Sequence, residues 1–450
     1  MDVTRNILND LRRFMAYPTI SSEVVRQQSM YECAAWLVDH LYAIGLQKAE
    51  LCQTSAHPLV YAEYQVHPSL PTLLFYGHYD VQPVDPLNKW DTPPFKAAIK
   101  GDYIVGRGAS DDKGQLFIHI KAVEDLLQGR QSDQVNIKFL IEGSEEIGSI
   151  GLRDFITSQK ERLKCDVAIV SDTKMSSLHV PAITYSLRGS LNAELIIQTM
   201  GKDLHSGTFG GGVPNAATLL STFIGQLHNR DHAIAIPGFY DDVRMLSSEE
   251  RLFIADNGIS DDSLLRDADA FSSWGEPGYT LHERMTIRPS LAVTGITAGF
   301  QGKGVKNVIP SVASAKLNFR LVPDQDPKKI CSLLDHYIEG QLPLAKVKTR
   351  YSSFNHPVTV PRSNPYIVAA TRACEYIFGR KVKFLQNGGT IGAVDYLHSL
   401  LGIPIVLMGF GQGSDNIHAP NERMYLPNFF KGIDTVKIFI ELVASMNRKK

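Results

Sequence analysis

Cysteine is scarce in this sequence, and its pattern excludes several classes of protein. The chain has 450 residues and five cysteines, an odd number, and no two of them have the CxxC spacing of a zinc-binding or redox motif. In a chain of this length, scattered cysteines are typical of reduced core thiols in a cytoplasmic protein rather than of a secreted disulfide framework. We therefore predict a cytoplasmic location and free thiols at Cys33, Cys52, Cys165, Cys331 and Cys374.

The sequence also has no long apolar run, almost no net charge and no nucleotide-binding motif. No stretch approaches the roughly 18 consecutive apolar residues of a membrane-spanning helix. The formal net charge of -1 gives no electrostatic reason to expect nucleic acid or an anionic membrane as a partner. No GxGxxG fingerprint follows a strand, so a nucleotide-dependent oxidoreductase is a remote hypothesis. At the N-terminus, apolar and charged residues alternate at helical spacing, which predicts an amphipathic helix ending near Pro18 and no secretory signal.

The length favours two domains, because a single core rarely serves 450 residues. In the first part of the chain, short apolar runs alternate with helical patterns, which predicts an α/β fold: a twisted mixed sheet flanked by helices. The expected helices are 29–45 and 114–128, and the expected strands are 59–66, 72–76, 135–141 and 166–170.

The pattern changes near residue 186, where strands with strictly alternating apolar and polar residues begin. Their order with the intervening helices is β-α-β-β-α-β, which predicts a ferredoxin-like α+β domain inserted into the first domain. The α/β pattern returns after Pro361. We therefore expect a catalytic domain formed by residues 1–185 and 358–450 and an inserted lid or dimerisation domain formed by residues 186–357.

Acidic and histidine residues follow several of the predicted strands. Ligands of open α/β sheets collect at the carboxyl ends of the strands, so these segments should converge at one edge of the sheet. Two imidazoles with several carboxylates and no thiolate favour zinc, manganese or cobalt, and a pair of such ions suits hydrolysis. Each residue alone is more simply explained as a solvated loop residue, and only the set indicates a metal site. The set consists of His78 and Asp80, Asp111 and Asp112, Glu145 and Glu146, Asp172 and His418.

Two short spacings support this site. His78 and Asp80 are one residue apart in FYGHYDVQP, so both side chains lie on the same side of an extended segment. Asp80 can then accept the second imidazole N–H and fix the tautomer that binds metal. In EGSEEIGS the adjacent side chains of Glu145 and Glu146 diverge, so one can bind metal while the other faces the water.

The motifs GHYDVQP, GRGASDDKG, EGSEEIGS, KDLHSGTFGGGV and HAPNE, in this order, resemble those of the carnosinase-like dipeptidases. These belong to the aminoacylase and glutamate carboxypeptidase family of co-catalytic metallopeptidases. The resemblance implies two divalent ions per subunit, zinc or manganese with cobalt as a further candidate. It also implies that Glu145 is the general base for a metal-bridging water. By the same resemblance, His78 and Asp172 would bind one ion, Glu146 and His418 the other, and Asp111 both, with Asp80 supporting His78.

The resemblance extends to substrate-binding residues in and beside the inserted domain. His205 would reach the partner subunit's active site in a homodimer and stabilise the oxyanion, and Arg320 would bind the C-terminal carboxylate of the substrate. Asn307, Gly389 and Thr390 would be further substrate contacts. The loop QNGGT departs from the family pattern, which commonly has a glutamate where Asn387 stands and a serine where Thr390 stands.

The sequence thus predicts a metal-dependent hydrolase that acts on dipeptides or other small peptides with a free C-terminal carboxylate. An N-acyl-amino-acid deacylase or desuccinylase is the alternative, because the same centre cuts any accessible amide. A catalytically inactive scaffold is a third hypothesis, and the presence of all five ligands and Glu145 argues against it.

Overall fold

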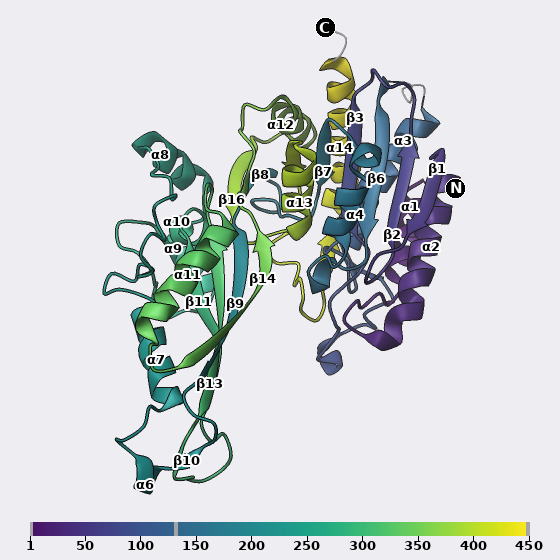
Figure 1. The fold of residues 1–450 in the computed structure, drawn as a ribbon. Coiled ribbons are helices and arrows are strands. Elements are labelled where there is room, and N and C mark those ends of the chain that lie inside the picture. The colour runs from purple at the N-terminus through teal and green to yellow at the C-terminus, as the bar shows by residue number, and fades with distance from the viewer. Residues whose placement is uncertain (1–2, 130–133, 447–450) are drawn as a thin grey trace. The chain divides into compact units, whose positions relative to one another are not determined.

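The chain forms two compact units, each assembled from separated segments. The computed structural model describes residues 3–129 and 134–446. The larger unit contains the described residues up to Tyr185, then Val360–Leu385, and those from Ile391 onward. The smaller unit consists of Ser186–Thr359 and the short segment Gln386–Thr390, which the sequence pattern had grouped with the catalytic domain. Figure 1 shows the course of the chain.

The larger unit is a mixed α/β fold. Its main sheet has the strand order β1-β2-β6-β3-β7-β17-β8. The three central pairings, β6 with β3, β3 with β7 and β7 with β17, are parallel, and the flanking pairs are antiparallel. The strands are β1 (Lys48–Cys52), β2 (Leu59–Tyr64), β3 (Thr72–His78), β6 (Asn136–Glu142), β7 (Val167–Val170), β8 (Ala182–Leu187) and β17 (Ile405–Leu407).

Helices cover this sheet, and three short strands form a separate small sheet with the order β18-β5-β4. α3 packs against both β3 and α14, and α13 packs against α4. The helices are α1 (Val3–Met15), α2 (Gln27–Ala43), α3 (Lys113–Gln128), α4 (Leu152–Ser158), α5 (Lys160–Leu163), α12 (Pro365–Phe378), α13 (Gly392–Leu401) and α14 (Leu426–Met446); the remaining strands are β4 (Ala98–Lys100), β5 (Tyr103–Val105), β16 (Lys383–Asn387) and β18 (Arg423–Tyr425).

The central strands are buried because helices lie on the sheet. Every residue of β6 and β7 is buried, as are six of the seven residues of β3. Strands buried on both faces have continuous apolar sequences, and Leu73–Tyr76 is such a run. None of the helices within the described residues is long and apolar enough to cross a membrane.

The smaller unit contains a four-stranded antiparallel sheet with the order β11-β13-β9-β14. Along the chain, these strands and two helices follow each other as β-α-β-β-α-β. The elements are β9 (Gly189–Gln198), α7 (Ala216–Gln226), β11 (Ser290–Ala298), β13 (Val312–Leu321), α11 (Pro327–Gln341) and β14 (Lys346–Asn355).

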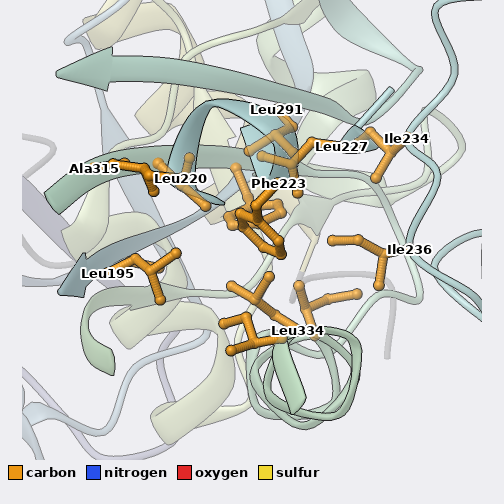
Figure 2. Close-up of a cluster of buried hydrophobic side chains, with 14 of the residues drawn as sticks. Leu195, Leu220, Phe223, Leu227, Ile234, Ile236, Leu291, Ala315 and Leu334 are labelled. Carbon is orange, nitrogen blue, oxygen red and sulfur yellow. The ribbon is translucent and has the colours of Figure 1, made fainter. Parts of the chain in front are cut away.

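The core of the smaller unit lies on one face of this sheet. In β9, Leu191, Ala193, Leu195 and Ile197 are buried and alternate with more exposed residues, as the period of two requires. Figure 2 shows residues of this core, with Phe223 at the centre of the view. The core is contributed by the strands and by α7 and α11. The opposite face of the sheet carries mainly polar side chains, with Ile196 and Val312 among them.

Residues 229–289 contain more helix than the sequence pattern predicted. The sequence pattern predicts a long irregular segment between a helix at 214–228 and a strand at 291–298, whereas the structure has three short helices there, two of which begin with a complete capping box. Ser247 and Thr280 accept from the backbone of Glu250 and Glu283, whose side chains accept in return. The remaining elements are β10 (Leu204–His205), α6 (Ser206–Phe209), α8 (Ser248–Asn257), α9 (Asp261–Asp267), α10 (Leu281–Thr286), β12 (Val308–Ile309) and β15 (Val358–Thr359).

Replacing the central aromatic residue of this core should destabilise the smaller unit. We expect Phe223→Ala to lower the free energy of unfolding by about 3–5 kcal/mol, because the ring is 1% exposed and its removal leaves a cavity. Urea unfolding measures the change. Phe271→Ala, which removes a fully exposed ring, is the matched control and should stay within about 0.5 kcal/mol of wild type. Equal effects of the two substitutions would contradict the assignment of this core.

Candidate metal centre

The end of β3 fixes the first histidine of the site. His78 is fully buried, and its Nδ1 lies 3.3 Å from Oδ1 of Asp80 and 3.1 Å from the carbonyl oxygen of Asp80. The same Asp80 carboxylate accepts the backbone N–H groups of Glu145 (3.2 Å) and Glu146 (3.1 Å). Asp80 therefore connects β3 to the Glu145–Ile147 turn after β6, and a proton on Nδ1 leaves Nε2 of His78 free to bind a ligand.

Asp111 stands between the two histidines. Its Oδ1 lies 3.1 Å from Nε2 of His78, and its Oδ2 lies 2.9 Å from Nε2 of His418. Nε2 of His418 is also 3.4 Å from Oε2 of Glu146. The five residues of the sequence prediction thus come together as two groups with ligand atoms within 4.8 Å of one another: His78, Asp111 and Asp172, and Asp111, Glu146 and His418. Asp111 belongs to both groups.

The electrostatics of the cluster favour bound cations. Burial, and then the charges of Asp111 and Asp112, raise the pKa of Asp172 well above its usual range. Burial also raises the pKa of Glu145 to about 8, with the charge of Glu146 adding to the effect and that of His78 opposing it. Oε1 of Glu146 is buried and has no hydrogen-bond partner among residues 3–129 and 134–446. Crowded carboxylates with an unsatisfied oxygen are stabilised by divalent ions, so these residues fit a metal centre.

His418 occupies a left-handed backbone conformation with φ 62°. Such a conformation costs a non-glycine residue about 1–3 kcal/mol and persists where the surroundings enforce it, often at functional sites. Two carboxylates of the same loop attach it to the loop that carries Asp111. Asp415 accepts Oγ–H of Ser110 (2.8 Å), and Glu422 accepts the backbone N–H of Asp111 (3.0 Å).

Glu422 is the last residue of the HAPNE motif, and it was not predicted to have a role in the site. Its side chain is fully buried, and besides Asp111 it accepts the backbone N–H groups of Gly108 (3.0 Å) and Ser110 (2.9 Å) and Nη1–H of Arg107 (2.8 Å). Both carboxylate oxygens are therefore used to hold the GRGASD loop. The sequence carries no signal for this role, because an acidic residue in a polar loop is usually solvated and the burial of Glu422 depends on tertiary packing.

Two other residues also support the ligands without having been predicted. Oδ2 of the buried Asp112 accepts the backbone N–H of His78 at 3.2 Å, and the Asp111–Asp112 peptide bond is cis. The side-chain N–H of Gln82 donates to Oε2 of Glu146 at 2.8 Å. Each of these contacts restrains a predicted ligand before any ion binds.

The remaining predicted residues lie in the smaller unit and form two groups. In the first group, Nη1–H of Arg320 donates to Oγ1 of Thr390 at 3.0 Å, although the two residues are 70 positions apart. Gly389 belongs to the same loop, and its N–H donates to Oδ1 of Asn387 at 2.9 Å. The smaller unit thus brings Arg320, Thr390 and Gly389 together.

The second group contains His205 and Asn307. β10 and β12 pair through His205 and Val308, and the backbone N–H of Ser206 donates to the carbonyl oxygen of Asn307 at 3.2 Å. His205 is exposed, and its Nδ1 accepts the N–H of Gly207 at 3.0 Å. β12 ends just before β13 begins, while Arg320 lies at the far end of β13. With a rise of about 3.3 Å per residue, Val312 and Arg320 are about 26 Å apart, so the two groups lie at opposite ends of the sheet.

Comparison with known proteins identifies the class. Residues 74–442 match the model of peptidase family M20/M25/M40, and the chain belongs to this family. It is a metallopeptidase, which confirms the resemblance predicted from the motifs. The Cys-Gly metallodipeptidase of Schizosaccharomyces pombe is 30% identical, over 97% of this chain and 95% of that protein. The Beta-Ala-His dipeptidase of Mus musculus is 29% identical, over 83% of this chain and 77% of that protein.

Solved structures agree with this assignment. An M20 family metallo-carboxypeptidase from Sulfolobus solfataricus has a TM-score of 0.87 and 34% identity, with 99% of this chain and 100% of that chain covered. Human carnosine dipeptidase 1 has a TM-score of 0.80 and 27% identity, with 98% and 96% covered. The mixed α/β fold is therefore shared along the whole chain.

The buried Glu422 provides a test of how the metal centre is supported. We expect Glu422→Gln to weaken metal binding about 10–100-fold, because the amide turns N–H groups toward the backbone donors of Gly108, Ser110 and Asp111. Calorimetric titration of metal-free protein with manganese measures the affinity. Glu441→Gln, on the exposed side of α14, is the control and should bind manganese as wild type does. Unchanged affinity in folded Glu422→Gln protein would refute the supporting role.

Proposed function

We propose that this metallopeptidase hydrolyses dipeptides, or other small peptides with a free C-terminal carboxylate. The proposal is carried by one observation: two groups of metal-binding side chains share a single carboxylate, Asp111. A carboxylate with each oxygen facing one histidine is suited to bridging two ions. The similarity to dipeptidases along nearly the whole chain supports the substrate class.

Two divalent ions would be held by the five ligands. His78 and Asp172 would bind one, Glu146 and His418 the other, and Asp111 both. Imidazole and carboxylate ligands without thiolate favour zinc or manganese, with cobalt as a further candidate. When bound, such ions polarise the scissile carbonyl and make a water a better nucleophile at neutral pH.

Glu145 is the proposed general base. Its backbone N–H donates to Asp80, which also contacts His78, so the position of Glu145 is tied to that of a proposed metal ligand. Glu145 accepts a proton from the attacking water and then delivers it to the leaving amine, which makes departure as a neutral amine possible. Asp80 orients the imidazole of His78 and takes no part in proton transfer.

Arg320 is the proposed anchor for the substrate's C-terminal carboxylate. A guanidinium can donate two parallel hydrogen bonds to a carboxylate, and Nη1 of Arg320 is already oriented by Thr390. Thr390 and the backbone of Gly389 would make further contacts with the substrate, and Asn307 would do so beside His205. The need for a free carboxylate follows from this anchor.

The smaller unit is proposed to be a ferredoxin-like lid and dimerisation domain. Its β-α-β-β-α-β order and its strand order β14-β9-β13-β11 support the ferredoxin-like assignment. In a homodimer, His205 would stabilise the oxyanion in the partner's active site. The separation of about 26 Å along β13 supports this assignment, because His205 and Arg320 of one chain cannot contact the same small substrate.

Two further predictions from the sequence, the cellular location and the alternative substrate class, are also proposals. The cytoplasmic location is a proposal that rests on five cysteines, all free. The deacylase alternative is not favoured, because the relatives that match the chain over nearly its full length include Cys-Gly metallodipeptidases. The Sulfolobus metallo-carboxypeptidase makes longer peptides a substrate class to include in any assay.

Replacing Glu145 tests the mechanism. We expect Glu145→Gln to lower kcat on a dipeptide at least about 100-fold, because no base then takes the proton from water. Its metal content per subunit should equal that of wild type, since Glu145 is not among the ligands. Activity assays on manganese- or zinc-loaded protein, with elemental analysis of the same samples, measure both. Glu161→Gln, exposed on α5, is the matched control and should be fully active.

The same assays test the function itself. Protein stripped by a chelator should be inactive and should recover when zinc or manganese is added back. Preference of the metal-loaded protein for N-acyl amino acids over dipeptides would overturn the proposed substrate class. Activity that survives complete removal of metal would overturn the two-metal mechanism.

The role of His205 in the partner's site can be tested by complementation. His205→Ala and Glu145→Gln should each be nearly inactive alone. In a heterodimer, one of the two sites combines an intact Glu145 with His205 of the partner subunit. After subunit exchange, half of the dimers are mixed, so about a quarter of wild-type activity should return. Activity no higher than that of the separate variants, in samples shown to contain heterodimer, would argue against action across the dimer.

A further inference from the structure

Arg188 connects the two parts of the smaller unit that form the proposed carboxylate site. It lies between β8 and β9, 202 positions from Thr390, and it contacts the loop Gln386–Thr390 at three points. Its Nε–H donates to the carbonyl oxygen of Gly388 at 2.9 Å, its backbone N–H donates to the carbonyl oxygen of Asn387 at 3.3 Å, and its carbonyl oxygen accepts Oγ1–H of Thr390 at 2.6 Å. The loop is thus bound to Arg188 through three of its five positions: 387, 388 and 390.

The other end of the guanidinium is also held. Nη1–H of Arg188 donates to the carbonyl oxygen of Arg288 at 3.1 Å, with Oγ of Ser290 at 3.4 Å. Gly388 packs so closely that a Cβ there would lie 2.1 Å from the carbonyl oxygen of Met285 and 3.0 Å from Nη2 of Arg188. The loop therefore has little room to move without breaking the contacts of Arg188.

Arg320 depends on this arrangement. Its Nη1–H donates to Oγ1 of Thr390, and the same hydroxyl donates its own proton to the carbonyl oxygen of Arg188. The hydroxyl of Thr390 is therefore oriented with its proton toward Arg188 and a lone pair toward Arg320. Loss of the Arg188 contacts would release the partner that orients Arg320.

Arg188 also contributes charge. No carboxylate forms an ion pair with Arg188 or Arg320 among the residues that the structure describes, whereas the neighbouring Arg288 is paired with Glu276 at 2.6 Å. Burial, and then the positive charge of Arg320, lower the pKa of Arg188 to about 10. Two partly buried guanidiniums without a counter-charge favour an anion more strongly than one, because the local dielectric constant is below that of water.

We propose that Arg188 is a specificity-determining residue of this enzyme: it positions Thr390 and Arg320 and, with Arg320, supplies the positive charge that selects substrates ending in a free carboxylate. Arg188 acts through Thr390 and Arg320, so it is a positioning residue rather than a catalytic one. The inference rests on the proposed function, since it concerns the same substrate.

The selectivity for a free carboxylate is the quantity that separates this role from a general structural one. It is the ratio of kcat/KM for a dipeptide to kcat/KM for the same dipeptide with a C-terminal amide. We expect Arg188→Met to reduce this ratio at least tenfold, mainly through a higher KM for the free acid, with kcat on the amide little changed. Arg188→Lys keeps the charge but cannot hold Gly388 and Arg288 together, so its ratio should lie between those of Arg188→Met and wild type.

Arg350→Met is the matched control, because it removes an equal charge from the same unit at an exposed position on β14. Its ratio should equal that of wild type. A ratio unchanged in Arg188→Met would overturn the inference, and if that variant does not fold, an unchanged ratio in Arg188→Lys would do so. A wild-type enzyme that cleaves dipeptides but does not distinguish acid from amide would also overturn it. Failure of wild type to cleave any dipeptide would refute the proposed function itself.

Discussion

The metal centre depends on one carboxylate that faces two imidazoles. Asp111 lies 3.1 Å from His78 and 2.9 Å from His418, and His418 is 307 positions further along the chain. This closeness exists because Glu422 accepts four N–H groups, including that of Asp111, and is only four residues from His418. Four such hydrogen bonds to a fully buried charge contribute more than bonds between neutral groups, and removing the acceptor would leave buried donors unpaired. The geometry of the candidate ligands is therefore set largely by side chains that would not touch the ions.

The candidate ligands and their support Asp80 could be predicted from the sequence, whereas the supports Glu422, Asp112 and Gln82 could not. His78, Asp172 and His418 each follow an apolar run, and the rule that ligands collect at the carboxyl ends of strands groups them without any knowledge of distance. Glu422 has no such signal. An acidic residue in a polar loop is usually solvated, and only the packed structure reveals that this one is buried. The chemistry of a site can thus be inferred from residue types, while the burial that orients them depends on tertiary contacts.

The same distinction applies to the smaller unit. Its sheet was predictable because the apolar residues of β9 and β13 alternate with polar ones. The short helices α8–α10 carry no strong apolar period and were missed, despite the capping boxes of α8 and α10. The grouping of Gln386–Thr390 with this unit was also missed. Nothing in the sequence indicates that Gln386–Thr390, which a helix and a strand separate from the insert, attaches to Arg188. The acceptors of these hydrogen bonds are backbone carbonyl oxygens, which every residue type has.

Each unit brings side chains of like charge together: acids around Asp172 in the larger unit, and Arg188 with Arg320 in the smaller unit. In the larger unit, burial and neighbouring acids raise the pKa of Asp172, so the protein without ions bears an electrostatic cost there. In the smaller unit, Arg188 and Arg320 bear the opposite cost. A bound divalent cation would remove the first cost, and a bound carboxylate would remove the second. The binding free energy at each site would then include the loss of this electrostatic cost. Ligands of opposite charge gain this contribution, whereas neutral analogues do not. On this argument, the proposed substrate carboxylate and the proposed metal ions would be selected by the same physical means, with opposite sign, in two units of one chain.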